Sequence, residues 1–135
     1  MEENSAGEIG LDQVDAVLAF LPLFDVERPV FGAMVSNPGE FPHFNASENV
    51  ERFVRALYDE GFILSFDWAK WRDESRRFLE EPGALETADL DILRKLFTTI
   101  VRADRFCEGY LAGELENGHV TAILRRLKQI RATLP

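Results

Sequence analysis

The sequence predicts an all-α fold, an irregular bundle of five to six helices that forms a single helical domain over residues 1–135. Apolar residues recur at the three- and four-residue spacing of amphipathic helices along most of the chain. Gly, Pro and Asn mark mostly short turns between these stretches. A chain of 135 residues, 46% of them hydrophobic, is enough for one core and too short for two. We expect residues 1–8 to form a flexible N-terminal tail.

The first predicted helix runs from Ile9 to Phe24, where apolar residues follow the helical period. From Asp25 to Asn45 that period is lost among prolines and glycines. We therefore predict a long irregular connection over residues 25–45, with one short extended piece from Val30 to Val35. Connections of this length in a small domain are often functional.

The next two helices are predicted from their caps. Asn45 and Glu48 fit a capping box that starts a second helix, and Gly61 fits its left-handed end. Asp67 is a good N-cap for a third helix that stops at Pro82-Gly83. Trp68 and Trp71 lie one turn apart in that helix. We interpret them as core anchors rather than as an aromatic wall for a ligand or peptide.

Three further helices are predicted in the second half. A fourth starts at Thr87, and a shift in apolar phase near Ala103-Asp104 separates it from a fifth over Phe106 to Leu115. Asn117-Gly118 ends the fifth, and Val120 to Ile130 forms a sixth with a basic outer face. Gly109 and Gly113 fall inside the fifth helix, where we expect them to allow a close helix crossing.

Charge is distributed unevenly along the chain. The net charge of −9 comes almost entirely from residues 1–60, whereas the last helix is basic. The single cysteine, Cys107, cannot form an internal disulfide, which favours a reducing, cytoplasmic location. The longest apolar stretch is too short to cross a bilayer, so we expect no membrane association. With two histidines in the chain, we also expect no metal site, and we expect no cofactor.

Several short strings of residues resemble one known family. They are Phe66-Asp67-Trp68 with Trp71, Arg102, Arg105-Phe106-Cys107-Glu108-Gly109, Gly118-His119 and Leu124-Arg125-Arg126-Leu127. With these strings the chain resembles, from about Gln13 to Arg131, a family of small bacterial and archaeal proteins catalogued as the domain of unknown function numbered six-five-zero-eight. The resemblance implies a small soluble prokaryotic protein and brings no established activity.

The most distinctive candidate site is the pair Arg102 and Arg105. On one helix face, two guanidinium groups three residues apart could clamp a phosphate or carboxylate. The interpretation we favour is structural: Arg105 pairs with Glu108, and Arg102 pairs with a carboxylate from the acidic half.

Candidate proton-transfer groups lie close by in the sequence. Glu108, Tyr110 and His119 could act as acids or bases beside an arginine clamp. A Cys107–His119 dyad fails on geometry if one helix holds both, because twelve residues at about 1.5 Å each separate them by roughly 18 Å. We therefore interpret Cys107 as a small buried apolar residue and His119 as a turn-stabilising group.

Three functions remain open on the sequence alone. The first is a non-enzymatic protein–protein interaction or accessory module, with self-association in which basic last helices meet acidic first halves. The second is helix-turn-helix-like nucleic-acid binding through residues 105–132, which the net charge disfavours. The third is an enzyme or binder for a small anionic ligand that uses Arg102 and Arg105. We favour the first, and no motif identifies the protein as an enzyme.

Overall fold

Helices dominate the structure, a computed structural model that describes residues 9–26 and 31–134. Six helices of at least seven residues lie within this part of the chain, which confirms the predicted irregular bundle. The expected flexible tail, residues 1–8, lies outside the described residues, as does Val30, where the predicted extended piece begins. No helix in the described ranges combines the length and apolar character that crossing a bilayer requires.

The predicted first helix is two helices. Helix α1 spans Leu11–Leu18, and the four-residue helix α2 spans Leu21–Phe24. Pro22 lies in the first turn of α2, a position that proline tolerates because that amide has no helical partner. The predicted continuous helix was therefore wrong at Ala19-Phe20, where the chain turns before α2 starts.

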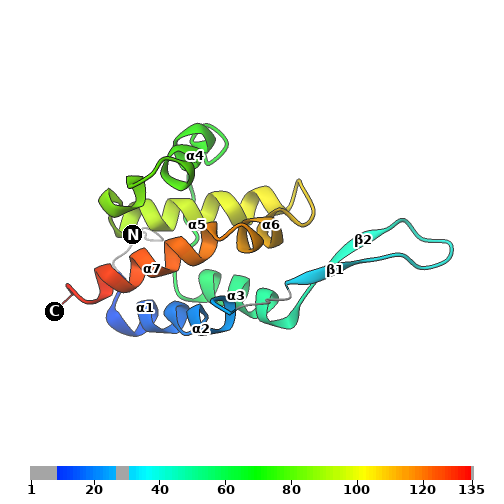
Figure 1. Ribbon diagram of the computed structural model, residues 1–135, viewed down its shortest axis with the longest axis horizontal. Coiled ribbons are helices and arrows are strands. Elements are labelled where there is room, and N and C mark those ends of the chain that lie inside the picture. Colours follow the sequence, from blue (N-terminus) through cyan, green and yellow to red (C-terminus); the bar gives the residue numbers. More distant parts are fainter. Residues whose placement is uncertain (1–8, 27–30, 135) are drawn as a thin grey trace.

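The irregular connection contains a β-hairpin. Strands β1 (Gly32–Val35) and β2 (His43–Ala46) pair antiparallel, with Gly32 opposite Ala46 and Val35 opposite His43. The extended piece near β1 was predicted and β2 was not, because Pro38, Gly39 and Pro42 looked like general breakers instead of turn residues that join two strands. Figure 1 shows the hairpin projecting from the helical body.

Helix α3 spans Glu48–Asp59 and begins two residues later than predicted. Ser47, not Asn45, is its N-cap, and the Ser47 hydroxyl accepts a hydrogen bond from the Val50 amide at 3.4 Å. Asn45 is held in the ladder of β2, so it is unavailable as a cap. Gly61 has a φ of +81°, which confirms the predicted left-handed ending.

Helix α4 is shorter than predicted, at Arg72–Glu80. Trp68 to Trp71 form turns: the Trp68 amide donates to the Phe66 carbonyl, and the Trp71 amide donates to the Trp68 carbonyl. Asp67 therefore does not cap the helix. A short 3₁₀ helix, η1 (Ala84–Thr87), follows and takes up Thr87, the predicted start of the next helix.

Helix α5 spans Leu90–Asp104, and Asp89 is its N-cap, accepting from the Ile92 amide at 2.9 Å. Its end at Asp104 confirms the predicted break. Helix α6 spans Tyr110–Glu116, and α7 spans His119–Arg131. Gly109 lies before α6 with a φ of +84°, so it is a turn residue and not a helical one. Gly113 is helical but faces open space, so the predicted close helix crossing was wrong.

The core is centred on α5 and on a chain of phenylalanine rings. Phe24, Phe53, Phe97 and Phe62 follow one another with ring centroids 5.1–5.9 Å apart, in edge-to-face contacts that aromatic pairs favour. These side chains are almost fully buried. In Figure 1, α4 lies on one side of α5, and α1 to α3 lie on the other side of the body.

The acidic and basic parts of the sequence form ion pairs with each other within one chain. Arg131 on α7 donates to the Asp15 carboxylate on α1 at 2.8 Å, and Arg125 donates to the Asp25 carboxylate at 2.7 Å. The basic last helix and the acidic first half therefore meet in one molecule. This removes the observation that suggested the same pairing between two copies.

Candidate functional site

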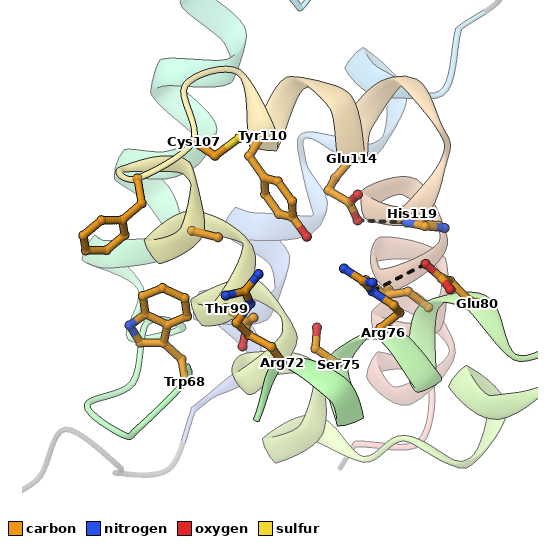
Figure 2. Close-up of a pocket in the computed structure, with 13 residues that line it drawn as sticks. Trp68, Arg72, Ser75, Arg76, Glu80, Thr99, Cys107, Tyr110, Glu114 and His119 are labelled. Atoms are coloured by element: carbon orange, nitrogen blue, oxygen red, sulfur yellow. Dashed lines mark hydrogen bonds and ion pairs between the residues drawn. The ribbon is translucent and has the colours of Figure 1, made fainter. Parts of the chain in front are cut away.

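A cavity of about 340 Å³ lies between α4, the end of α5, the turn 105–109 and α6. We call it the α4–α6 cavity (Figure 2). Its polar walls are formed by Arg72, Ser75, Arg76, Tyr110, Glu114 and His119. The volume is at the lower end of the range for small-molecule sites.

One wall carries two cations. Arg72 and Arg76 are four residues apart on α4, so they lie on the same face of the helix. Figure 2 shows both guanidinium groups directed toward the cavity. Arg76 also approaches Glu80 at 3.8 Å, but both side chains are more than half exposed, so this ion pair holds Arg76 weakly. The next arginine, Arg77, pairs with Glu74 and does not line the cavity.

Ser75 lies between the two arginines and is only 5% exposed. In Figure 2 its hydroxyl is directed into the cavity. A buried hydroxyl normally has a hydrogen-bond partner. Ser75 therefore places a hydroxyl, which can both donate and accept, between the two arginines at the cavity wall.

Tyr110 places a second hydroxyl in the same space. It is the first residue of α6, and Figure 2 shows its phenol oxygen near the middle of the cavity. Burial raises the pKa of the Tyr110 phenol above its ordinary value of 10.0, and the nearby Glu114 carboxylate raises it further. Arg76 and Arg72 act in the opposite direction on that pKa. Tyr110 thus stays protonated and able to donate at neutral pH.

Glu114 and His119 form a fixed pair at the far wall. His119 Nδ1 lies 2.8 Å from Glu114 Oε2, and their side chains are 24% and 13% exposed. Asn117 joins them, since its amide nitrogen donates to Glu114 Oε1 at 3.1 Å and its oxygen accepts from the His119 amide at 3.0 Å. The left-handed Gly118, with a φ of +89°, lets the chain turn back so that these groups meet.

The remaining end of the cavity is apolar. The rings of Trp68 and Phe106 lie 5.9 Å apart with a tilt of 32°, and Ala103 also lines the cavity. Phe106 is 82% exposed, so an apolar group in the cavity would cover part of its ring. The cavity therefore has a cationic end and an apolar end.

The structure brings together some of the sequence-predicted site residues. Trp68, Tyr110 and His119 line the α4–α6 cavity, as does Cys107. Cys107 is exposed, so its interpretation as a buried residue was wrong. The argument that separated it from His119 also fails, because α5, α6 and α7 are three helices and not one.

The other predicted residues lie elsewhere. Arg102 and Arg105 line a neighbouring hollow of about 250 Å³, and the Arg102 guanidinium lies 5.9 Å from the centre of the Tyr58 ring. Trp71 stacks on Phe78, and the Lys95 Nζ atom lies 5.8 Å from the centre of the Trp71 ring. Glu108 is exposed in the turn before α6. The Arg102–Arg105 pair is thus outside the main cavity.

Sequence reasoning missed Arg72, Ser75, Arg76 and Glu114. The α4 residues belong to a helix rich in Arg, Asp and Glu, a composition typical of a solvent-exposed surface helix. The only usable signal was the spacing of Arg72, Ser75 and Arg76, which places a hydroxyl and two cations on one face. Among the residues described, no group of three or more His, Cys, Asp or Glu side chains is placed to hold a metal ion.

Comparison with known proteins gives one match. A family model described as a family of unknown function, DUF6508, matches residues 10–133. No curated protein and no solved structure matches the chain. Since the family model covers almost the whole sequence, the chain belongs to the DUF6508 family.

Proposed function

We propose that the protein binds a small organic anion in the α4–α6 cavity. The observation that carries this proposal is the convergence of Arg72, Arg76 and the Ser75 and Tyr110 hydroxyls on one space of about 340 Å³. Guanidinium groups bind phosphates and carboxylates through paired N–H donors, and neutral hydroxyls add further hydrogen bonds to such groups. This keeps the anionic-ligand alternative and replaces Arg102 and Arg105 as its clamp.

The charges of the cavity favour an anion over a cation. Of its two carboxylates, Glu114 already accepts from His119 and Asn117, and Glu80 lies beside Arg76. Arg72 lines the same cavity, and its positive charge acts on the Tyr110 phenol there. An anion placed between the two guanidinium groups would meet opposite charge on one wall and a hydroxyl donor on the other.

The apolar end of the cavity indicates which chemical group is attached to the anion. Trp68, Phe106 and Ala103 offer ring faces and aliphatic carbons to a ligand in the same cavity. Burial of an apolar group there would contribute about 25 cal/mol for each Å² removed from water. We therefore propose a ligand in which one phosphate or carboxylate is attached to a ring or a short aliphatic group.

Calorimetric titration with phenyl phosphate tests this proposal. We expect wild-type protein to bind phenyl phosphate more tightly than inorganic phosphate, and to bind benzyl alcohol least, because only the first probe uses both ends. The double variant Arg72→Ala, Arg76→Ala should lose at least tenfold in affinity. A matched double variant, Arg52→Ala, Arg55→Ala on the exposed face of α3, should bind like wild type. Equal binding by both double variants contradicts the proposal.

Binding needs no reaction, so this function is compatible with a non-enzymatic accessory module. A second candidate, protein–protein interaction, is favoured by the projecting hairpin, where Phe41 is 93% exposed and Met34 is 65% exposed. Nucleic-acid binding through residues 105–132 gains no support: Arg125 and Arg131 pair with carboxylates, and Arg126 donates to the Ala88 carbonyl at 2.9 Å.

A further inference from the structure

Arg102 and Arg105 line a second hollow, of about 250 Å³, next to the α4–α6 cavity. We call it the Arg102–Arg105 hollow. Ser65 adds a hydroxyl to its wall, and none of the described residues that line it carries a carboxylate. The α4–α6 cavity, by contrast, is also lined by Glu80 and Glu114. The charges of the second hollow therefore favour an anion over a cation as well.

The two hollows share part of one wall. Trp68 and Phe106 line both of them, and the centroids of these two rings lie 5.9 Å apart. Figure 2 shows Trp68 at one end of the α4–α6 cavity. On α5, Ala103 lines the α4–α6 cavity, and its neighbour Arg102 lines the Arg102–Arg105 hollow. A ligand that lies along the Trp68–Phe106 pair can therefore reach from one hollow into the other.

The Arg102–Arg105 hollow attracts a single anion less strongly than its two cations suggest. Arg102 lies in the last turn of α5, and Arg105 is the C-cap. The C-terminal end of a helix carries about half a negative elementary charge, which opposes the charge of the two guanidinium groups. The Arg102 guanidinium also lies 5.9 Å from the centre of the Tyr58 ring. We therefore expect a lone phosphate to bind first between Arg72 and Arg76.

A second anion gains from this hollow when it is attached to a group that the α4–α6 cavity already holds. Its binding is then intramolecular, so a weak site contributes through a high effective concentration. The linking group has to pass the rings that both hollows share. An aromatic linker suits this path, because it can pack against the Trp68 and Phe106 rings as it crosses them.

We propose that the ligand carries two anionic groups, one at each end of a system of one or two aromatic rings. One phosphate or carboxylate lies between Arg72 and Arg76. The rings lie along Trp68, and the second anion lies in the Arg102–Arg105 hollow. The second subsite rests on the proposed function, because the first anion and the ring must already occupy the α4–α6 cavity.

Calorimetric titration with three bisphosphates tests this proposal. The bisphosphates of hydroquinone and of para-linked biphenol carry phosphates at opposite ends of one ring and of two rings. Catechol bisphosphate carries the same two groups on adjacent carbons, so it matches their charge but cannot reach both hollows. We expect the better fitting of the two end-to-end compounds to bind wild type about tenfold or more tightly than catechol bisphosphate and phenyl phosphate do.

Variants of the second hollow should remove this advantage selectively. The double variant Arg102→Ala, Arg105→Ala should bind the end-to-end compound no more tightly than catechol bisphosphate, and it should bind phenyl phosphate like wild type. Normal phenyl phosphate binding also shows that the variant is folded. Arg105→Glu, at an exposed residue, should have the same selective effect. The matched double variant Arg52→Ala, Arg55→Ala on α3 should keep the advantage.

The two proposals fail in different ways. If wild type binds phenyl phosphate but binds neither end-to-end compound more tightly than catechol bisphosphate, the second subsite is refuted and the α4–α6 site stands. An advantage that survives in both Arg102→Ala, Arg105→Ala and Arg105→Glu also refutes the second subsite. If phenyl phosphate does not bind wild type at all, the proposed function is wrong and the second subsite is wrong with it.

Discussion

Arg94 shows how a single buried cation joins two elements. It lies on α5, is 3% exposed, and donates through Nε and Nη2 to the Gly61 carbonyl at 3.2 and 2.9 Å. Gly61 ends the α3 segment, so the guanidinium ties the end of one helix to the middle of another. Desolvation lowers the pKa of Arg94, an effect that Asp91 partly offsets, yet an arginine remains charged at any physiological pH.

Replacing Arg94 with methionine should destabilise the fold. The Arg94→Met variant keeps the aliphatic bulk but leaves the Gly61 carbonyl without these two donors, at a cost of about 1–3 kcal/mol in the free energy of unfolding. Urea denaturation measures this change. Arg52→Met on the exposed face of α3 serves as the control and should lie within about 0.5 kcal/mol of wild type. Equal midpoints for the two variants would contradict this role for Arg94.

Tyr110 reports on the electrostatics of the α4–α6 cavity. Burial, the largest cause of its raised pKa, is retained when neighbouring charges are removed. In a Tyr58→Phe background, which leaves one tyrosine, Glu114→Gln should lower the Tyr110 pKa because a negative neighbour is lost. Arg72→Ala or Arg76→Ala should raise it, because each removes a positive neighbour. Ultraviolet titration of the phenol measures both directions, and shifts of the same sign would refute this arrangement.

At the scale of elements, most differences from the sequence-based predictions lie at helix ends. The spacing of apolar residues located the helices. At several helix ends more than one residue could act as the cap, and the tertiary fold determines which one does. Ser47 caps α3 because Asn45 is paired in β2. Similarly, Gly109 adopts a left-handed turn that the periodic pattern around it did not reveal, since Phe106 and Tyr110 fit a helix as well as a turn.

The glycines around α6 provide an element-scale prediction. Gly113 is helical, and an added Cβ would meet no atom within 4 Å, so Gly113→Ala should stabilise the fold by about 0.5–1 kcal/mol. Gly118 also has open space, but its φ of +89° is strained for any residue with a Cβ, and Gly118→Ala should destabilise by about 1–2 kcal/mol. Thermal unfolding of both variants checks the opposite signs. A loss of stability in Gly113→Ala would mean that this face of α6 is covered.

At the scale of the whole molecule, the contacts between the chain's two ends link stability to pH. The Arg131 hydrogen bond lowers the pKa of the Asp15 carboxyl below its ordinary value of 3.8. Its contribution to stability is therefore fully present above that value and is lost as the pH falls through the lower folded-state pKa. Asp15→Asn should lower the unfolding midpoint slightly at neutral pH.

Comparing wild type with Asp15→Asn at acid pH provides the control for this prediction. The difference between wild type and Asp15→Asn should disappear once Asp15 is protonated in the folded state. Chemical denaturation at a series of pH values measures it. A difference that persists unchanged at the acid end would show that the substitution acts through something other than the Arg131 contact.

The fold class could be predicted from the sequence far better than the site. The helical period of apolar residues can be read within each segment, without knowing how the segments pack. The helical bundle could therefore be predicted directly. The α4–α6 cavity depends on how α4 lies against α6, and nothing local relates Arg76 to Tyr110. Trp68, Tyr110 and His119 were singled out for their chemistry. Arg72 and Arg76 were missed because their helix looks like ordinary surface.

The central claim is that Arg72 and Arg76 hold an anion in the α4–α6 cavity, and a crystal structure with phenyl phosphate tests it most directly. We predict that the phosphate lies between the two guanidinium groups within hydrogen-bond distance of the Tyr110 hydroxyl, with the phenyl ring against Trp68. An empty α4–α6 cavity in crystals grown at saturating phenyl phosphate, or a phosphate bound at Arg102 and Arg105, would contradict the account.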